Sequence, residues 1–352
     1  MPSKKVIYLG GVPIGGGNPI TVQSMLRSSL SDLSSCLQEA WRLLEGGCEI
    51  IRVALYDEEQ LSNLSSLKRS LKVPLVADVH FVPELAIKAL LSGADGVRIN
   101  PGNMRKVEVI KELARVAREE GKVIRVGVNL GSIPRERRAA YEDDASAMVD
   151  LALETIRLLE DEGFENIKVS LKASDVMTTV KAYRLASRVM EYPLHLGITE
   201  AGPVWEGAIK SAVGLGILLA DGIGDTIRVS LTGDGLKEVE AAYVILRSLG
   251  LRKVGVEIVS CPRCGRCEID LERIVREVEE KVKPIRKYMK VAVMGCVVNG
   301  PGEARDADLG IAGGKGKGVI FRKGEILETV SESKLVDRLL KLIKEVEGDE
   351  DE

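Results

Sequence analysis

The chain of 352 residues is 45% hydrophobic but only 3% aromatic, and its formal net charge is −3. This length is enough for a large domain and a smaller one, with a core built mainly of Val, Ile, Leu and Ala, as in parallel strands covered by helices. The small acidic balance excludes an overall basic field, so we expect no nucleic-acid partner.

The apolar segments of the chain are too short for export or for a membrane span. Val6–Leu9 is shorter than the core of a signal peptide, and the longest apolar run, Ala212–Ala220, cannot cross a bilayer. We therefore expect a cytoplasmic protein without a membrane partner, whose six cysteines are thiols or metal ligands rather than disulfides. Cys36 and Cys48 lie in apolar helical contexts, which predicts small buried core residues.

The first 250 residues repeat one pattern, a short β-branched run followed by an amphipathic helical stretch. One such helix has Ile110, Leu113, Val116 and Ala117 at the spacing of a single buried face. Eight units in about 230 residues predict a (β/α)8 TIM barrel; a doubly wound sheet is the alternative, but no Gly-x-Gly-x-x-Gly turn follows the first strand. Gly10–Gly17 predicts the turn of an N-terminal hairpin. The predicted strands are Ile20–Met25, Glu49–Ala54, Pro74–His80, Gly96–Asn100, Val123–Asn129, Asn166–Lys172, Pro193–Thr199 and Asp225–Ser230.

After about Leu251 the pattern changes and predicts a second, smaller α/β domain over residues 251–352, the barrel occupying residues 1–250. Gly313–Gly318 is typical of a glycine-rich hairpin turn, although such a segment can also hold phosphate. The acidic end Glu347–Glu352 predicts a solvated tail. The predicted elements are strands at Val254–Val259, Val291–Met294, Leu309–Ala312 and Val319–Phe321, and helices starting at Asp270 and over Lys334–Val346.

Polar residues collect where the predicted barrel strands end, which is where barrel enzymes carry their function. Five of them are cations that should converge on one mouth without matching carboxylates, and clustered like charge needs an anion. Arginine forks and a lysine suit phosphate oxygens, so we expect a compact, strongly anionic ligand such as a diphosphate. These positions are Gln23, Ser24, Arg52, Asp78, His80, Arg98, Asn100, Arg125, Asn129, Lys172, Glu200, Arg228 and Ser230.

Two further side chains at these positions have distinct expected roles. Glu200 is the single carboxylate expected at the end of the seventh strand, where it could donate a proton or steer a cationic or radical intermediate. The alternative, a counter-ion for a neighbouring arginine, stays open. His80 lies at a strand end and is assigned, with Asn100, to substrate binding, whereas His195 lies inside a strand and is expected to be a core histidine.

Two cysteine segments about thirty residues apart indicate a metal centre. Cys261 and Cys264 have the two-residue spacing that presents two sulfurs to one metal, and Cys296 lies in a Gly/Asn/Pro-rich loop that ends at Glu303. An iron–sulfur cluster held by three thiolates and one oxygen keeps one iron available to a substrate oxygen. Cys267 competes as a ligand, and zinc held by Cys261, Cys264, Cys267 and Cys296 is the structural alternative.

The chain resembles the 4-hydroxy-3-methylbut-2-enyl diphosphate synthases, the iron–sulfur enzymes of the non-mevalonate isoprenoid pathway, in their two-domain bacterial form. The resemblance extends over nearly the whole chain and includes both cysteine segments. The other motifs that carry it are Val22-Gln23-Ser24-Met25, Ala77-Asp78-Val79-His80-Phe81, Arg98-Ile99-Asn100-Pro101-Gly102-Asn103, Lys172-Ala173-Ser174-Asp175-Val176 and His195-Leu196-Gly197-Ile198-Thr199-Glu200-Ala201-Gly202.

This resemblance implies reductive ring opening and dehydroxylation of 2-C-methyl-D-erythritol 2,4-cyclodiphosphate, with two electrons from flavodoxin or ferredoxin. It implies homodimers in which the cluster domain of one subunit closes over the barrel of the other. It also implies a [4Fe–4S] cluster, with Cys267 not among the family's ligands. The implied residues are Cys261, Cys264, Cys296 and Glu303 for the cluster, Arg52, Arg98, Arg125, Lys172, Arg228 and Ser230 for the diphosphate with Asn129 nearby, and Glu200 facing the reacting carbons.

Two other functions fit parts of the pattern. A Schiff-base aldolase would use Lys172 on the sixth strand as its nucleophile and hold zinc in the small domain. A zinc-dependent nucleic-acid-binding module is disfavoured by the acidic balance and by the lack of a basic stripe with stacking aromatics.

Overall fold

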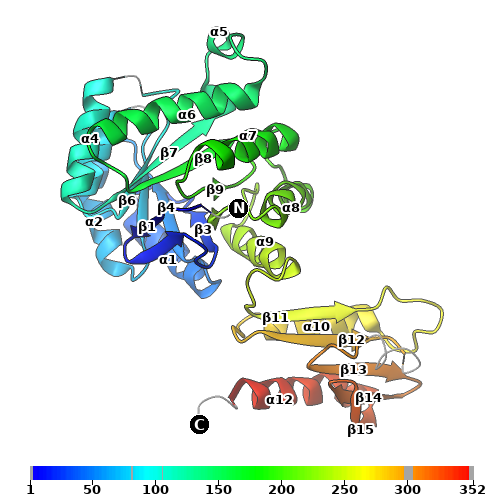
Figure 1. Cartoon of the computed structure of the whole chain (residues 1–352). Helices are drawn as coiled ribbons and strands as arrows, with labels where there is room; N and C mark the ends of the chain where they lie inside the picture. Colours follow the sequence, from blue (N-terminus) through cyan, green and yellow to red (C-terminus); the bar gives the residue numbers. More distant parts are fainter. Residues whose placement is uncertain (1–2, 81, 105, 297–303, 349–352) are drawn as a thin grey trace. The chain divides into compact units, whose positions relative to one another are not determined.

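The computed structural model describes residues 3–80, 82–104, 106–296 and 304–348, which separate into two compact units, Met1–Arg252 and Lys253–Glu352 (Figure 1). The first unit holds a ring of parallel strands surrounded by helices, and the second a smaller sheet with helices. Each unit is described by itself below.

The first unit is a (β/α)8 barrel, as the sequence predicts. Its parallel sheet has the order β8-β7-β6-β5-β4-β3-β10-β9, and a parallel bridge between Val169 and Leu194 joins the two ends of that order. Each strand therefore pairs with the next one in the chain and the eighth with the first. The strands are β3 (Thr21–Met25), β4 (Ile50–Ala54), β5 (Leu75–Asp78), β6 (Gly96–Ile99), β7 (Val123–Asn129), β8 (Ile167–Lys172), β9 (His195–Leu196) and β10 (Thr226–Ile227).

The helices of the barrel lie outside the strands (Figure 1). Helix α4 buries Ile110, Leu113 and Ala117 and half-buries Val116, which confirms the face predicted from their spacing. No helix among the residues described is long and apolar enough to cross a membrane. The helices are α1 (Leu33–Glu45), α2 (Leu61–Ser70), α3 (Pro83–Leu91), α4 (Val107–Glu119), α5 (Arg135–Arg138), α6 (Asp144–Asp161), α7 (Val176–Val189), α8 (Val204–Ala220) and α9 (Gly235–Ser248).

A two-stranded hairpin closes the amino-terminal end of the barrel. Strands β1 (Val6–Leu9) and β2 (Val12–Gly15) pair antiparallel, and the turn between them has positive φ at Gly10 and Gly11, where glycine carries no steric cost. Its buried side chains pack on the first residues of the barrel strands in a cluster of Ile7, Leu9, Ile14, Ile50, Val76 and Val123. The predicted hairpin is confirmed, and it supplies the apolar floor of the barrel.

The second unit is a five-stranded mixed sheet of order β11-β12-β13-β14-β15, in which the first three strands are parallel. Its core contains side chains of both helices, including Ile274 and Leu339. Gly313–Gly318 spans the ends of β13 and β14 and the turn between them, as predicted, whereas β15 was not predicted because most of its residues are exposed. The elements are β11 (Val256–Ser260), α10 (Leu271–Val282), β12 (Met289–Met294), β13 (Leu309–Gly314), β14 (Lys317–Arg322), β15 (Glu325–Ser331) and α12 (Leu335–Gly348).

Candidate active site

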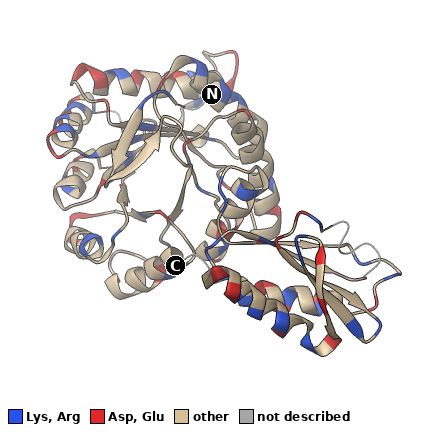
Figure 2. Cartoon of the chain, turned by 60° about the horizontal axis from the view of Figure 1, so that its bottom comes forward, with Lys and Arg blue, Asp and Glu red and all other residues tan. Residues whose placement is uncertain are grey.

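The interior of the barrel is polar above its apolar floor. TIM barrels usually fill this space with layers of Val, Ile and Leu, but here buried charged and amide side chains project from one strand after another, and Lys and Arg colour parts of the strands inside the ring of helices (Figure 2). Burying so many polar side chains costs free energy unless they pair with one another or bind a ligand. The buried polar residues on strands β3 to β10 are Thr21, Gln23, Ser24, Arg52, Asp78, Arg98, Arg125, Lys168, Ser170, Lys172, His195 and Thr226.

Asp78, at the end of β5, organises the first group of cations. Its carboxylate lies 3.6 Å from Arg52 Nε, 3.4 Å from Arg98 Nη1 and 3.4 Å from His80 Nε2. Burial alone would raise the pKa of Asp78, but Arg52, the hydrogen bond with His80, and Arg98 together hold the pKa well below its usual range. Asp78 is therefore ionised and positions two arginines and a histidine beside one another.

The expectation of cations without matching carboxylates is wrong for three of the five. Arg52 and Arg98 contact Asp78, and Arg228 Nη2 lies 3.4 Å from Glu238, a buried residue of α9. Glu238 comes from a helix, so its approach to a strand end could not be read from the strand pattern. These contacts hold guanidinium groups in place while leaving the cluster with more positive than negative charge.

Arg125 and Lys172 have no carboxylate contact among the described residues. The Nε and Nη1 atoms of Arg125 are buried without a hydrogen-bond partner there. Burial, followed by the nearby Arg125 and Arg52, lowers the pKa of Lys172 well below its usual value. An anion bound beside such a lysine would stabilise its protonated form, because the anion supplies both a hydrogen-bond acceptor and an opposite charge. This pair is the part of the barrel that most clearly lacks a negative partner.

Lys168 belongs to the same cation cluster and was missed by sequence reasoning. It lies two residues into β8 rather than at its end, is 1% exposed, and its Nζ has no hydrogen-bond partner among the described residues. Burial and the neighbouring Arg125 and Arg52 lower the pKa of Lys168 to about 7. The available signal was the alternation in β8, where Lys168, Ser170 and Lys172 occupy every second position and therefore share one face of the strand.

His195 is only partly the satisfied core histidine that was expected. Its Nδ1 lies 2.6 Å from Thr226 Oγ1, but its Nε2 is buried without a partner in the described structure. Burial, then Arg125, Lys172 and Lys168, lower the pKa of His195 well below its usual value, so the ring is neutral. It therefore presents an unused nitrogen inside the barrel.

The other predicted site residues lie at the carboxyl ends of the strands or just beyond them. Asn100 is buried, and its Oδ1 accepts from Gly102 N at 3.2 Å and Ser132 Oγ at 3.1 Å, so it fixes the loops after β6 and β7. Asn129 is the last residue of β7, and Ser230 follows β10. Gly127 leaves room for Arg98, whose Nε would lie 2.6 Å from an added Cβ.

Glu200 follows β9 with a φ of 52°, in the left-handed region that non-glycine residues seldom adopt. Such strain concentrates at functional sites because packing elsewhere must maintain it. The residue is exposed, and no hydrogen bond or ion pair of its side chain occurs among the described residues. Its carboxyl group is consequently available to a ligand.

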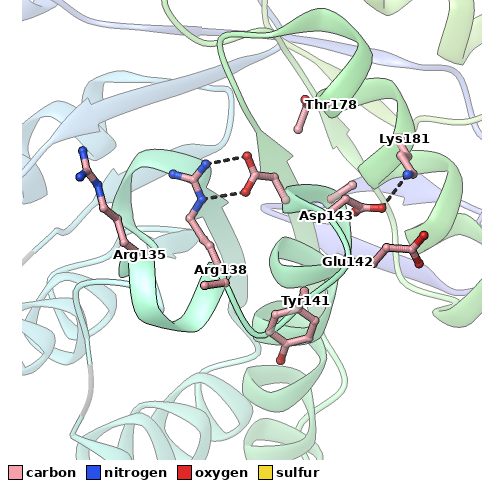
Figure 3. A pocket seen from close by; sticks show the side chains of 10 residues that line it. Arg135, Arg138, Tyr141, Glu142, Asp143, Thr178 and Lys181 are labelled. Atoms are coloured by element: carbon pink, nitrogen blue, oxygen red, sulfur yellow. Dashed lines mark hydrogen bonds and ion pairs between the residues drawn. The ribbon is translucent and has the colours of Figure 1, made fainter.

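A separate surface hollow of about 720 Å³ lies among α5, α6 and α7 (Figure 3). Four of its charged groups pair with one another, Arg138 with Asp144 and Lys181 with Asp143. None of the residues lining it belongs to the cation cluster. It is therefore distinct from the candidate active site.

The two cysteine segments meet at one edge of the second unit. Cys261 follows β11 and Gly295 follows β12, and the carboxyl ends of these adjacent parallel strands lie side by side. Gly295 N donates to Cys261 Sγ at 3.3 Å, and an added Cβ on Gly295 would lie 2.7 Å from Cys267 Sγ. The glycine thus lets the loops approach closely enough for Cys296 to join the same edge.

The remaining donors differ in their surroundings. Cys264 is exposed, and hydrogen bonds from the backbone and side chain of Arg266 lower its pKa, which favours the thiolate that metals bind. The Cys267 thiol donates to the Ile269 carbonyl at 3.3 Å. Glu303 lies outside the described residues, and within the described part of the chain no three metal-binding side chains are gathered around one point. The thiols are donors of the kind that an iron–sulfur cluster takes, and they come from two loops at one edge of the sheet. Cys36 and Cys48 are buried in the barrel, as predicted.

The fold and these two sites define a barrel protein with a buried cation cluster and an appended domain that carries paired cysteine loops. The chain belongs to the GcpE family: residues 4–243 match the GcpE TIM-barrel domain, and residues 257–345 match the GcpE protein C-terminal domain. The family resemblance inferred from the motifs is thereby confirmed.

Curated relatives match along nearly their whole length. A protein of Caldanaerobacter subterraneus is 52% identical over 98% of this chain and 97% of its own, and one of Thermodesulfovibrio yellowstonii is 50% identical over 96% and 97%. Geobacter sulfurreducens has another, 50% identical over 97% of both chains. All three are named 4-hydroxy-3-methylbut-2-en-1-yl diphosphate synthase (flavodoxin).

Solved structures support the barrel alone. A dihydropteroate synthase from Stenotrophomonas maltophilia has a TM-score of 0.54 at 14% identity, covering 70% of this chain and 99% of its own. A dihydropteroate synthase from Yersinia pestis has a TM-score of 0.53 at 16% identity, covering 70% and 100%. At such identity the likeness concerns the fold and not the reaction.

Proposed function

We propose that this chain opens the ring of 2-C-methyl-D-erythritol 2,4-cyclodiphosphate and removes a hydroxyl group, forming 4-hydroxy-3-methylbut-2-enyl diphosphate. The observation that carries the proposal is the buried cation cluster of the barrel, where Arg125 and Lys172 lack a carboxylate partner among the described residues. The name shared by the near-full-length relatives supports this product.

The barrel residues bind and orient the diphosphate. Asp78 fixes Arg52 and Arg98, Glu238 fixes Arg228, and Lys172 and Arg125 supply the remaining positive charge. Preorganised donors in a water-poor site stabilise negative charge that grows on the phosphate oxygen as the ring opens. His80, Asn129 and Ser230 at the strand ends complete the contacts to the substrate.

Glu200 is the proton donor of the proposed reaction. The hydroxyl group that departs needs a proton in order to leave as water, and a carboxyl group held on a strained turn at the mouth of the barrel is placed to give it. With no competing partner among the described residues, its carboxyl group is free to do so.

Cys261, Cys264 and Cys296, with Glu303, would hold a [4Fe–4S] cluster. When bound, such a cluster supplies the substrate with electrons one at a time. Gly295 N–H donates to Cys261 Sγ at 3.3 Å, whereas the Cys267 thiol donates to the Ile269 carbonyl at 3.3 Å. Flavodoxin is the proposed electron donor, in keeping with the relatives' names, with ferredoxin as the other candidate. The proposed homodimer rests on the family resemblance, and light scattering of the purified protein tests it.

The direct test is turnover under anaerobic conditions. Protein reconstituted with iron and sulfide should convert the cyclodiphosphate with reduced flavodoxin, and mass spectrometry should detect 4-hydroxy-3-methylbut-2-enyl diphosphate. Unchanged substrate in the presence of an intact cluster would refute the assignment.

A second test concerns Glu303. The Glu303→Ala variant should remain brown but turn over little substrate, whereas full activity would remove this residue from the mechanism. The exposed Glu280→Ala variant, in α10 of the second unit, is the matched control.

A further inference from the structure

A set of unpartnered polar groups lies on the barrel strands, and it includes Lys168, which pairs in register with Arg125 of the cation cluster. Thr21 and His195 both pair in register with Thr226, so they occupy neighbouring positions on adjacent strands. The buried atoms of this set that lack a hydrogen-bond partner in the described part of the chain are Thr21 Oγ1, Gln23 Oε1 and Nε2, Lys168 Nζ and His195 Nε2.

Orphaned polar groups on this scale are unusual. Native proteins satisfy nearly all buried polar atoms, often through internal water with two to four polar partners. The four side chains of this set provide both donors and acceptors, which is the mixture that internal water satisfies, and such a water would give a proton a path to Lys168.

Lys168 stands out in this set because no ion pair joins it to a carboxylate of the described residues. The nearest acidic influence is Asp225, but its Oδ2 accepts from Leu194 N at 2.7 Å and its Oδ1 from Ser3 Oγ at 2.8 Å. The other groups that face Lys168 are Arg125 from β7, Arg52 from β4 and the neutral His195 from β9. An ammonium ion here would sit among like charges in a buried site, which is strongly unfavourable.

We propose that Lys168 is a positioning residue of the anion site that is mostly neutral in the free protein at pH 8 and there takes up a proton from solvent when a diphosphate binds. This rests on the proposed function, because it needs a diphosphate at the cation cluster. The anion offsets the repulsion from Arg125 and Arg52, so the Lys168 amine becomes an ammonium ion. No bond to the ligand forms and no oxidant or reductant is involved.

The physical consequence is that binding of the anion and of a proton are linked. At pH 8 a group with a pKa of about 7 is roughly nine-tenths deprotonated, so nearly one proton is taken up at Lys168. At about pH 6 the amine is already mostly protonated, and the uptake falls to roughly a tenth. The pKa of Lys172 is also lowered, so Lys172 can take up a proton on anion binding as well. That uptake is common to the wild type and to the Lys168 variants, and it cancels when their proton uptakes are compared.

The test is isothermal titration calorimetry with inorganic pyrophosphate, in two buffers of different ionisation enthalpy, at pH 8 and pH 6. The wild-type protein should take up close to one more proton than Lys168→Met at pH 8, and the difference should nearly vanish at pH 6. Lys168→Arg, which keeps a permanent charge, should lose the uptake but retain its affinity. Lys181→Met, an exposed lysine, is the matched control and should behave as wild type.

Each result of these titrations either supports the proposal or overturns it. Equal proton uptake by wild type and Lys168→Met at pH 8 would overturn this inference and leave the diphosphate site standing. Absence of pyrophosphate binding by the wild-type protein would overturn the anion site and the inference with it. If Lys168→Met does not fold, Lys168→Arg alone decides, because uptake equal to wild type in that variant contradicts the proposal.

Discussion

Replacing Asp78 with Asn tests whether this carboxylate organises the cation cluster. The side chain is 3% exposed and contacts Arg52, Arg98 and His80. Removing one partner of a buried ion pair typically costs 3 to 5 kcal/mol, and because Asn keeps the shape and some hydrogen bonding we expect about 3 kcal/mol. For a unit of this size, that lowers the melting temperature by about 6 to 12 °C.

The loss of stability caused by Asp78→Asn should depend on pH in a defined way. Because the folded protein holds the pKa of Asp78 below its unfolded value of about 3.9, the stabilisation is fully present above that value and is lost as pH falls through the folded pKa. The difference between wild type and Asp78→Asn should therefore stay constant from pH 7 to pH 5 and narrow only below about pH 4.

Urea denaturation followed by circular dichroism and by tryptophan fluorescence measures this difference. Both tryptophans, Trp41 and Trp205, belong to the barrel unit, so the fluorescence reports on that unit. The matched control is Asp221→Asn, whose partner Arg184 is on the surface and which should cost less than about 1 kcal/mol. An Asp78→Asn variant as stable as wild type at pH 7, or a difference that already narrows between pH 7 and pH 5, would refute the reasoning.

Three further predictions follow from named contacts. Lys172→Met should weaken pyrophosphate binding by about 2 kcal/mol, roughly 30-fold in Kd, with unchanged iron content; calorimetry and iron analysis check this, and iron loss with normal binding would contradict it. Gly197→Ala should destabilise the barrel by about 1 to 3 kcal/mol, because the added Cβ would lie 2.6 Å from Lys172 Nζ and 2.7 Å from Arg228 O. Gly216→Ala in α8 is the control, since its Cβ meets nothing within 4 Å and the change should stabilise the helix by about 0.5 to 1 kcal/mol. Melting temperatures that shift in the same direction for both variants would refute the packing argument. Cys261→Ala and Cys296→Ala should abolish iron binding while Cys267→Ser and the buried Cys36→Ala retain it, and iron retained in the first two would exclude them as ligands.

The barrel could be predicted from the sequence because each strand carries its own local signal. Buried β-branched runs such as Val123–Asn129 alternate with amphipathic helices, and that alternation specifies parallel pairing and a closed ring. The edge strand Glu325–Ser331 lacks this signal, because an exposed strand has no apolar face to bury.

The site could be predicted less completely, for reasons of distance along the chain. The strand-end rule finds Arg52, Arg98 and Lys172, but it passes over Lys168, which lies two pleats earlier on the same strand. It also cannot reveal that Glu238 in a helix reaches Arg228, since nothing local marks the direction of a helix side chain toward a strand end. Which charges pair depends on the tertiary structure, so the prediction from sequence alone was wrong about how many of the cations have a carboxylate partner.

Anaerobic purification followed by iron and sulfide analysis and electron paramagnetic resonance of the reduced protein is the most direct measurement of the central claim. We predict a brown protein with about four irons and four sulfides per chain and a resonance typical of a reduced [4Fe–4S] cluster. Colourless protein that lacks iron and holds one tightly bound zinc on its cysteines would contradict the account.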